Sequence, residues 1–180
     1  IAAMLRELER PETDHQRRKA IGDRLDALGD PRRGIGVGSD GTPEIDWCPV
    51  PGGEVVIEEE KRTKEHVEPF YTARYPVTAT QYKAFVEADD GWRNSRWWRD
   101  DLRRDALTGP DELGRIGNHP VVRVNWYDAV AFCRWLGHRL GFTVGLPDEF
   151  QWQQSATGGL AGRTWPWGSN RDVKREPYLA

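Results

Sequence analysis

Cysteine and methionine are scarce in this chain of 180 residues, which has two cysteines and one methionine. Two cysteines, at positions 48 and 133, are too few for the disulfide framework of a small secreted domain. Cys133 stands in an apolar helical pattern, so we expect a buried free thiol, with a bridge to Cys48 as the alternative. Reduced cysteines are typical of the cytoplasm, where we expect the protein to be located.

Long apolar runs and an excess of one charge are also missing. No stretch approaches the length of a membrane-spanning helix, and no signal-peptide pattern opens the chain, so we expect no membrane partner. The 26 basic and 29 acidic residues are interspersed and give a net charge of −3. Because nucleic-acid binding requires a clustered basic excess, we also expect no nucleic-acid partner.

Large aromatic side chains are abundant: the chain has nine Trp, five Phe and five Tyr, although its mean hydropathy is only −0.77. A chain of this length buries roughly 70% of its surface, so these side chains suffice for a core. We expect core positions for Trp126, Trp135, Trp152, Trp165 and Trp167. Trp97 and Trp98, with Arg96 and Arg99 beside them, lie in an irregular region and are our candidate binding residues.

The first 44 residues predict helices followed by a linker. Pro11 ends a helix over residues 1–10, and Asp14 caps a second helix that runs to residue 28 and stops at Gly29. We therefore expect a helical leader over residues 1–33, either the end of a helical-repeat region or a simple leader, and a linker over residues 34–44. The linker is rich in glycine, but it follows no strand, so it does not predict a dinucleotide site.

Capping signals predict three further helices. Thr78 and Asp148 are each followed by Gln three positions later, which is the pattern of a capping box. Asn125 is expected to cap a helix over residues 126–140, after a strand over residues 121–124. The other expectations are strands over residues 45–57 (with a turn at 51–53) and 67–75, and a solvated loop over residues 58–65.

Five groups of short motifs follow one another along the chain. They are Ile45-Asp46-Trp47 with Pro51-Gly52-Gly53; Pro69-Phe70-Tyr71 with Tyr75-Pro76-Val77-Thr78 and Gln81-Tyr82; His119-Pro120-Val121-Val122 with Val124-Asn125-Trp126-Tyr127-Asp128-Ala129; Leu146-Pro147-Asp148-Glu149-Phe150-Gln151-Trp152; and Trp165-Pro166-Trp167-Gly168. In this order they resemble the formylglycine-generating enzyme (sulfatase-modifying factor) family. The resemblance implies a loop-rich α+β fold of the C-type-lectin-like class over residues 45–180.

The chain also departs from the family pattern. Gly145 stands where the family has Arg before Leu-Pro, and Asp148-Glu149 replaces Thr-Glu. The family continues well past the last motif, and its true oxidases carry two copper-binding cysteines in that later part. The chain therefore resembles the N-terminal portion of the domain, and we expect the rest to be in another chain, disordered or removed.

Few residues have the spacing of a reactive site. The four histidines are His15, His66, His119 and His138, and none has the spacing of a metal-binding pair. We expect a structural hydrogen bond for His119 and a solvated helix face for His138. An acid/base pair at Asp148 and Glu149 is less favoured than helix capping. The sequence therefore predicts no catalytic residue, no metal site and no cofactor in this chain.

These observations lead to one main hypothesis and two alternatives. We expect a non-catalytic binding or interaction module in a bacterial multidomain or proteolytically processed signalling or defence protein. Its partner would be a protein, or the remaining part of the same domain in a second chain. The first alternative is a metal-dependent oxidase of the family whose catalytic cysteines lie downstream. The second is a scaffold fragment made by proteolysis, which the isoleucine at position 1 would fit.

Overall fold

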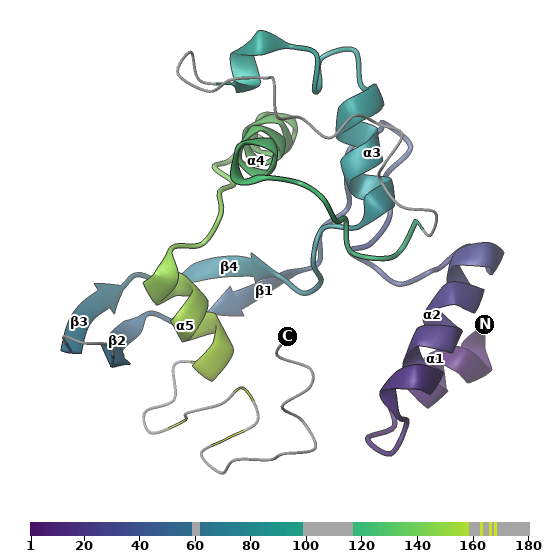
Figure 1. Ribbon diagram of the computed structural model, residues 1–180, viewed down its shortest axis with the longest axis horizontal. Coiled ribbons are helices and arrows are strands. Elements are labelled where there is room, and N and C mark those ends of the chain that lie inside the picture. The colour runs from purple at the N-terminus through teal and green to yellow at the C-terminus, as the bar shows by residue number, and fades with distance from the viewer. Residues whose placement is uncertain (59–61, 99–116, 159–162, 164–165, 167, 169–180) are drawn as a thin grey trace. The chain divides into compact units, whose positions relative to one another are not determined.

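The computed structural model describes residues 1–58, 62–98, 117–158, 163, 166 and 168 (Figure 1). It divides into two compact units, which are described separately below. The first unit comprises Ile1–Asp46 and Ala73–Leu146, and the second comprises Trp47–Thr72 and Pro147–Ala180. Helices and small sheets occur together, which confirms the predicted α+β class. None of the helices described is long and apolar enough to cross a membrane.

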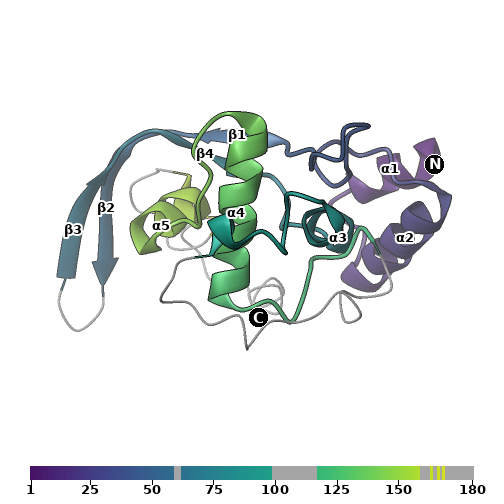
Figure 2. The same ribbon diagram turned by 90° about the horizontal axis from the view of Figure 1, so that it is seen from above.

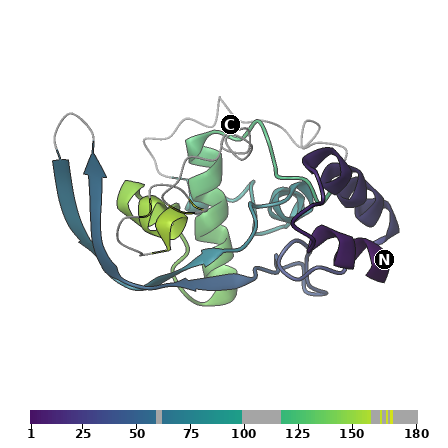
Figure 3. The ribbon, with the colours of Figure 1, turned by 90° about the horizontal axis from the view of Figure 1, so that it is seen from below.

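The first unit begins with two helices that pack against each other, α1 (Ala2–Leu8) and α2 (His15–Leu28) (Figure 3). The Asp14 side chain accepts a hydrogen bond from the Arg17 N–H at 2.8 Å, and Gly29 follows α2 with φ 80°. Both observations confirm the predicted limits of this helix. Ile21 and Leu25 form its buried face, one turn apart.

Polar side chains of α2 hold the segment at residues 117–119. The Asn118 N–H donates to Asp26 Oδ1 at 2.8 Å, and the Asn118 side-chain amide donates to the Gly22 carbonyl at 2.9 Å. His119 Nε2 and Asp23 Oδ1 lie 2.8 Å apart. The structural hydrogen bond predicted for His119 is therefore confirmed, and these bonds connect positions that are more than 90 residues apart in sequence.

The glycine-rich segment contacts the start of α3 (Ala79–Glu87). The Thr78 hydroxyl donates to the Ile35 carbonyl at 2.8 Å, and the Gln81 amide donates to the Gly34 carbonyl at 3.1 Å. The same two side chains form the predicted capping box, since the Thr78 N–H donates to Gln81 Oε1 at 2.9 Å. Both side chains are fully buried, so their polar atoms require these partners.

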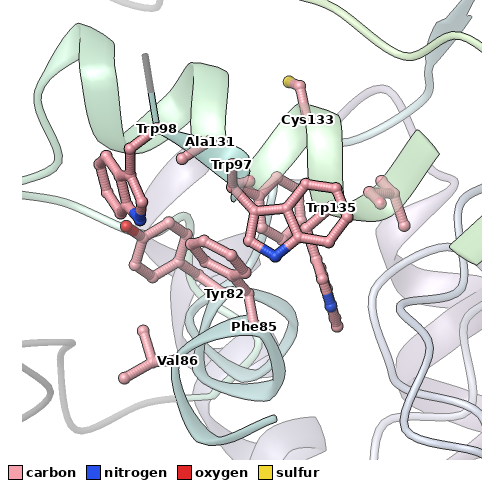
Figure 4. Close-up of a cluster of buried hydrophobic side chains, with 10 residues drawn as sticks. Tyr82, Phe85, Val86, Trp97, Trp98, Ala131, Cys133 and Trp135 are labelled. Carbon is pink, nitrogen blue, oxygen red and sulfur yellow. The ribbon is translucent and has the colours of Figure 1, made fainter. Parts of the chain in front are cut away.

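The core of the first unit lies between α3 and α4 (Trp126–Leu140) (Figure 4). The ring of Phe85 lies 5.3 Å from that of Trp135 and 5.8 Å from that of Phe132, measured between centroids. Such tilted and edge-to-face pairs each contribute about 0.5–1.5 kcal/mol beyond the area they bury. Tyr82, Phe85 and Val86 form the face of α3 that is buried in this core.

Among its described residues, the second unit has two sheets of two strands and one helix. Strand β1 (Trp47–Val50) pairs with β4 (Phe70–Ala73), and β2 (Gly53–Glu58) pairs antiparallel with β3 (Arg62–Val67) (Figure 2). Helix α5 (Glu149–Thr157) packs on β2, and its buried Gln154 donates to the Pro51 carbonyl at 2.8 Å. The turn at residues 51–53 thus separates two strands that belong to different sheets.

Two secondary-structure predictions are wrong. The loop expected over residues 58–65 is largely strand β3, in which His66 lies directly opposite Glu54 of β2 and Lys64 forms an ion pair with the same carboxylate. The strand expected over residues 121–124 does not form. Only an isolated bridge links Pro120 to Thr78 there, because the partner segment turns into helix α3 at Ala79, directly after the bridge.

Candidate functional site

Large apolar side chains are exposed at the start of α4 and in the segment that precedes it. Trp126 is 57% exposed, Val122 55% and Tyr127 39%. The rings of Trp126 and Tyr127 meet edge to face with centroids 5.3 Å apart. Exposed apolar side chains that are grouped in this way mark interaction sites. We call this group, together with Arg123, the Trp126 surface.

A capping box fixes the backbone that carries these side chains. Asn125 Oδ1 accepts from the Asp128 N–H at 3.0 Å, and Asp128 Oδ2 accepts from the Asn125 N–H at 3.0 Å. Each bond occupies an N–H group that would otherwise have no partner inside the helix. The Trp126 surface is therefore presented by an ordered helix start.

Arg123 lies three positions before Trp126 and has an unusual backbone conformation. It is the only non-glycine residue with a positive φ, at 60°, among those that the structure describes, and it is exposed. This left-handed conformation costs an L-residue roughly 1–2 kcal/mol. Between residues 117 and 133, Asp128 is the only other Asp, Glu, Lys or Arg, and it is fully buried.

The buried Asp128 carboxyl lies close to the Tyr82 hydroxyl of α3. Burial raises the pKa of Asp128 above its ordinary value. Burial, and secondly the nearby Asp128 charge, raise the pKa of Tyr82. Tyr82 Oη and Asp128 Oδ1 find no hydrogen-bond partner among the described residues. These two groups are therefore buried polar groups between α3 and α4 and are not part of the exposed Trp126 surface.

The residues predicted to bind a partner lie elsewhere in the first unit. Trp97 and Trp98 are both buried, with 5% and 8% of their surface exposed. Their indole N–H groups donate to backbone carbonyls, and the short helix η1 (Ser95–Trp97) packs on α4. Arg96 is exposed and its guanidinium lies 4.5 Å from the centroid of the Trp97 ring. Arg99 lies outside the described residues, and a binding role for the four stays a prediction.

The cysteine and histidine side chains, which are common nucleophiles and metal ligands, show no arrangement of a reactive site among the described residues. Cys48 and Cys133 are free thiols, and burial raises the pKa of Cys133 to about 11, so the prediction of a buried free thiol is confirmed. His138 is exposed on α4, as predicted, and its ring lies 5.4 Å from that of Trp97. In the part of the chain that the structure describes, no three His, Cys, Asp or Glu side chains are placed to hold a metal ion.

Helix geometry explains why the Trp126 surface was missed in the sequence. At about 100° per residue, the nine positions from Trp126 to Trp135 place the two side chains on opposite faces of α4. The core prediction is confirmed for Trp135 but wrong for Trp126 and for Trp152, which is exposed on α5. Trp165 and Trp167 lie outside the described residues. The nine-residue spacing between Trp126 and Trp135 was the sequence signal that one of them lies on the exposed face of the helix.

Comparison with known families places this site in a recognised domain. The model of the family "Sulfatase-modifying factor enzyme 1-like domain" matches residues 40–179, which is most of the chain. The chain belongs to this family. The resemblance found in the five groups of motifs is therefore confirmed, and the Trp126 surface lies within the matched stretch.

Relatives of this sulfatase-modifying factor domain include formylglycine-generating enzymes and an inactive paralogue. The formylglycine-generating enzyme of Mus musculus is 44% identical over 71 residues, covering 39% of this chain and 18% of that protein. That of Streptomyces coelicolor is 43% identical over 76 residues, covering 42% and 20%. The "Inactive C-alpha-formylglycine-generating enzyme 2" of Bos taurus is 48% identical over 141 residues, covering 61% and 44%.

The matched part of the chain spans about a fifth of the first two relatives and less than half of the third. The family match begins at residue 40, inside the segment expected to be a linker over residues 34–44. The division into leader, linker and domain stays a prediction.

Proposed function

We propose that this sulfatase-modifying factor domain is a non-catalytic module that binds a partner protein through the Trp126 surface. The exposure of Trp126 and Tyr127 on a capped helix start, with the exposed Val122 in the segment before it, is the observation that carries this proposal. Aromatic side chains of this size, held on an ordered backbone, are typical anchors of protein interfaces.

Three side chains of types that often act in catalysis have structural roles in this protein. Cys133 lies in the core, and a thiol with a pKa of about 11 is almost wholly protonated near neutral pH, so it is a weak nucleophile. His119 is bonded to Asp23, and Asp148 caps α5 through the Gln151 N–H at 2.7 Å. The bovine relative that is named inactive matches a larger share of this chain than the mouse and Streptomyces enzymes do.

A cytoplasmic location inside a bacterial multidomain or processed signalling or defence protein is part of this proposal. The free state of both cysteines supports the cytoplasm, because thiols persist in reducing compartments.

The alternative is a metal-dependent oxidase of the same family whose catalytic cysteines lie downstream of this chain. The specific observation in its favour is the identity of 44% and 43% to two proteins named formylglycine-generating enzyme. The two hypotheses differ in whether the full-length protein binds a metal ion and oxidises a peptide thiol.

Metal analysis and oxygen uptake separate the two functions. We expect the purified full-length protein to lack stoichiometric copper or iron and to consume no dioxygen when a cysteine-containing peptide is added. The Streptomyces coelicolor enzyme, prepared in parallel, is the positive control. Stoichiometric metal together with oxidation of the peptide thiol would overturn the non-catalytic proposal.

A further inference from the structure

Two arginines and a histidine contact Trp97, away from the Trp126 surface. We propose that Arg96, Arg134 and His138, which we call the Trp97 site, bind a phosphate monoester, an anion that carries nearly two negative charges and three acceptor oxygens at neutral pH. This inference does not depend on the function proposed for the Trp126 surface. It assigns a chemical class of ligand to part of the region in which the sequence predicted binding.

Trp97 brings the three side chains of the site together. The Arg96 Cζ lies 4.5 Å from the centroid of the Trp97 ring, and the centroid of the His138 ring lies 5.4 Å from it. Arg134 Nη1 donates to the Trp97 carbonyl at 3.0 Å. Arg134 and His138 are four positions apart in α4, so they are neighbours on one face of the helix. The indole is buried, so the side chains gather around an ordered residue.

The charges of Arg96 and Arg134 are not offset by a carboxylate in the part of the chain that the structure describes. The contacts of their guanidinium groups are the Trp97 ring and the Trp97 carbonyl. The carboxylate of Asp90, whose backbone carbonyl accepts the indole N–H of Trp97, is bonded to Arg139 Nη2 at 2.6 Å. Because Arg139 offsets the charge of Asp90, an anion is the electrostatic complement of the two other arginines.

The hydrogen-bond donors of the site suit phosphate better than carboxylate. Arg96 is exposed, and its cation–π contact with the indole leaves the N–H groups of the guanidinium available. Arg134 uses one of its five N–H groups on the Trp97 carbonyl, and the exposed His138 adds a ring nitrogen. A carboxylate fills one guanidinium with its two oxygens, whereas a phosphate monoester has the oxygens and the charge to pair with both.

Titration of the full chain with phenyl phosphate, followed by NMR of the arginine Nε–H groups, tests the site. Sodium chloride is reduced as the ligand is added, so that the ionic strength stays constant. We expect the signals of Arg96 and Arg134 to shift along one saturable curve. The signal of Arg24, an exposed arginine of α2, should not move. Benzoate, which carries a carboxylate on the same ring, should bind at least about fivefold more weakly.

Variants of Arg96 test the charge separately from the fold. Arg96→Gln should bind phenyl phosphate about tenfold more weakly, because it removes a charged hydrogen-bonding group. Arg96 is exposed, so this variant should melt close to the unaltered protein. Arg96→Lys keeps the charge but loses the planar fork, so it should retain part of the affinity. The matched control is Arg24→Gln, which should bind as the unaltered protein does.

Three outcomes would overturn the inference. The first is the absence of a saturable shift, or equal shifts at Arg24 and Arg96. The second is an unchanged affinity in Arg96→Gln. The third concerns Asp100 and Asp101, which follow in the sequence and lie outside the described residues. If phenyl phosphate binds only when both are changed to asparagine, a carboxylate of the same chain is the natural occupant. Each result leaves the proposed function intact, because the Trp126 surface shares no residue with the Trp97 site.

Discussion

The two ends of α4 use tryptophan in opposite ways. Trp135 is 0% exposed, packs against Phe85 and donates its indole N–H to Asp90 at 3.2 Å. Trp126, nine positions earlier, is 57% exposed and contacts Tyr127. Tryptophan is therefore part of the core at position 135 and part of the surface at position 126. The position of each residue around the helix axis determines whether its side chain is buried or exposed.

The largest effect that tests this comparison is expected from Trp135→Ala. Removing a fully buried indole should lower the free energy of unfolding by about 3–5 kcal/mol, measured by urea denaturation. Trp126→Ala is the matched variant on the same helix and should change stability by less than about 0.5 kcal/mol. Equal losses in the two variants would show that Trp126 is also a core residue in solution.

A smaller effect is expected from Asn125→Ala. This variant removes the side chain that accepts from the Asp128 N–H, which should cost about 1 kcal/mol of unfolding free energy. Asn125→Asp keeps an acceptor oxygen and should remain near the unaltered stability. If Asn125→Ala also weakens binding of the partner protein, the ordered helix start contributes to the Trp126 surface. An unchanged free energy of unfolding in Asn125→Ala would argue that the capping bond is not formed in solution.

The smallest effect on stability is expected from Asp128→Asn, and its size should depend on pH. Burial raises the folded pKa of Asp128, so its ionisation destabilises the fold progressively as pH rises above the unfolded value of about 3.9. Asparagine cannot ionise but keeps an oxygen for the Asn125 N–H. We therefore expect a higher melting temperature near neutral pH and little change in acid, below the unfolded pKa.

The control for this pH effect is Asp148→Asn, which alters the exposed cap of α5 and should show no comparable gain near neutral pH. A gain of equal size for Asp128→Asn at all pH values would contradict an ionisation effect. Tyr82 is the titratable group that faces Asp128 from α3, so Tyr82→Phe should preserve the direction of the pH dependence.

Helix starts were predicted well from the sequence because their signals are local. Thr78, Asn125 and Asp148 each cap a helix, and in each case the residue three positions later closes the box. Every atom involved lies within four consecutive positions, so no knowledge of the tertiary structure was needed.

Strand pairing and exposure were predicted less well because they depend on distant residues. The sequence indicated strands on both sides of residues 51–53, but not that β1 pairs with β4 and β2 with β3. Likewise, the burial of Trp97 and Trp98 depends on their packing against α4, more than 30 residues away. Residue type alone did not separate these buried indoles from the exposed Trp126.

The hydrogen bonds between α2 and residues 117–119 bear on how the protein should be truncated. A piece cut to the family match at residue 40 would lose Asp23 and Asp26, the partners of His119 and Asn118. It would also lose the Ile35 carbonyl that accepts from Thr78. A recombinant fragment with that boundary would leave these donors without acceptors, so the smallest stable fragment should begin upstream of α2.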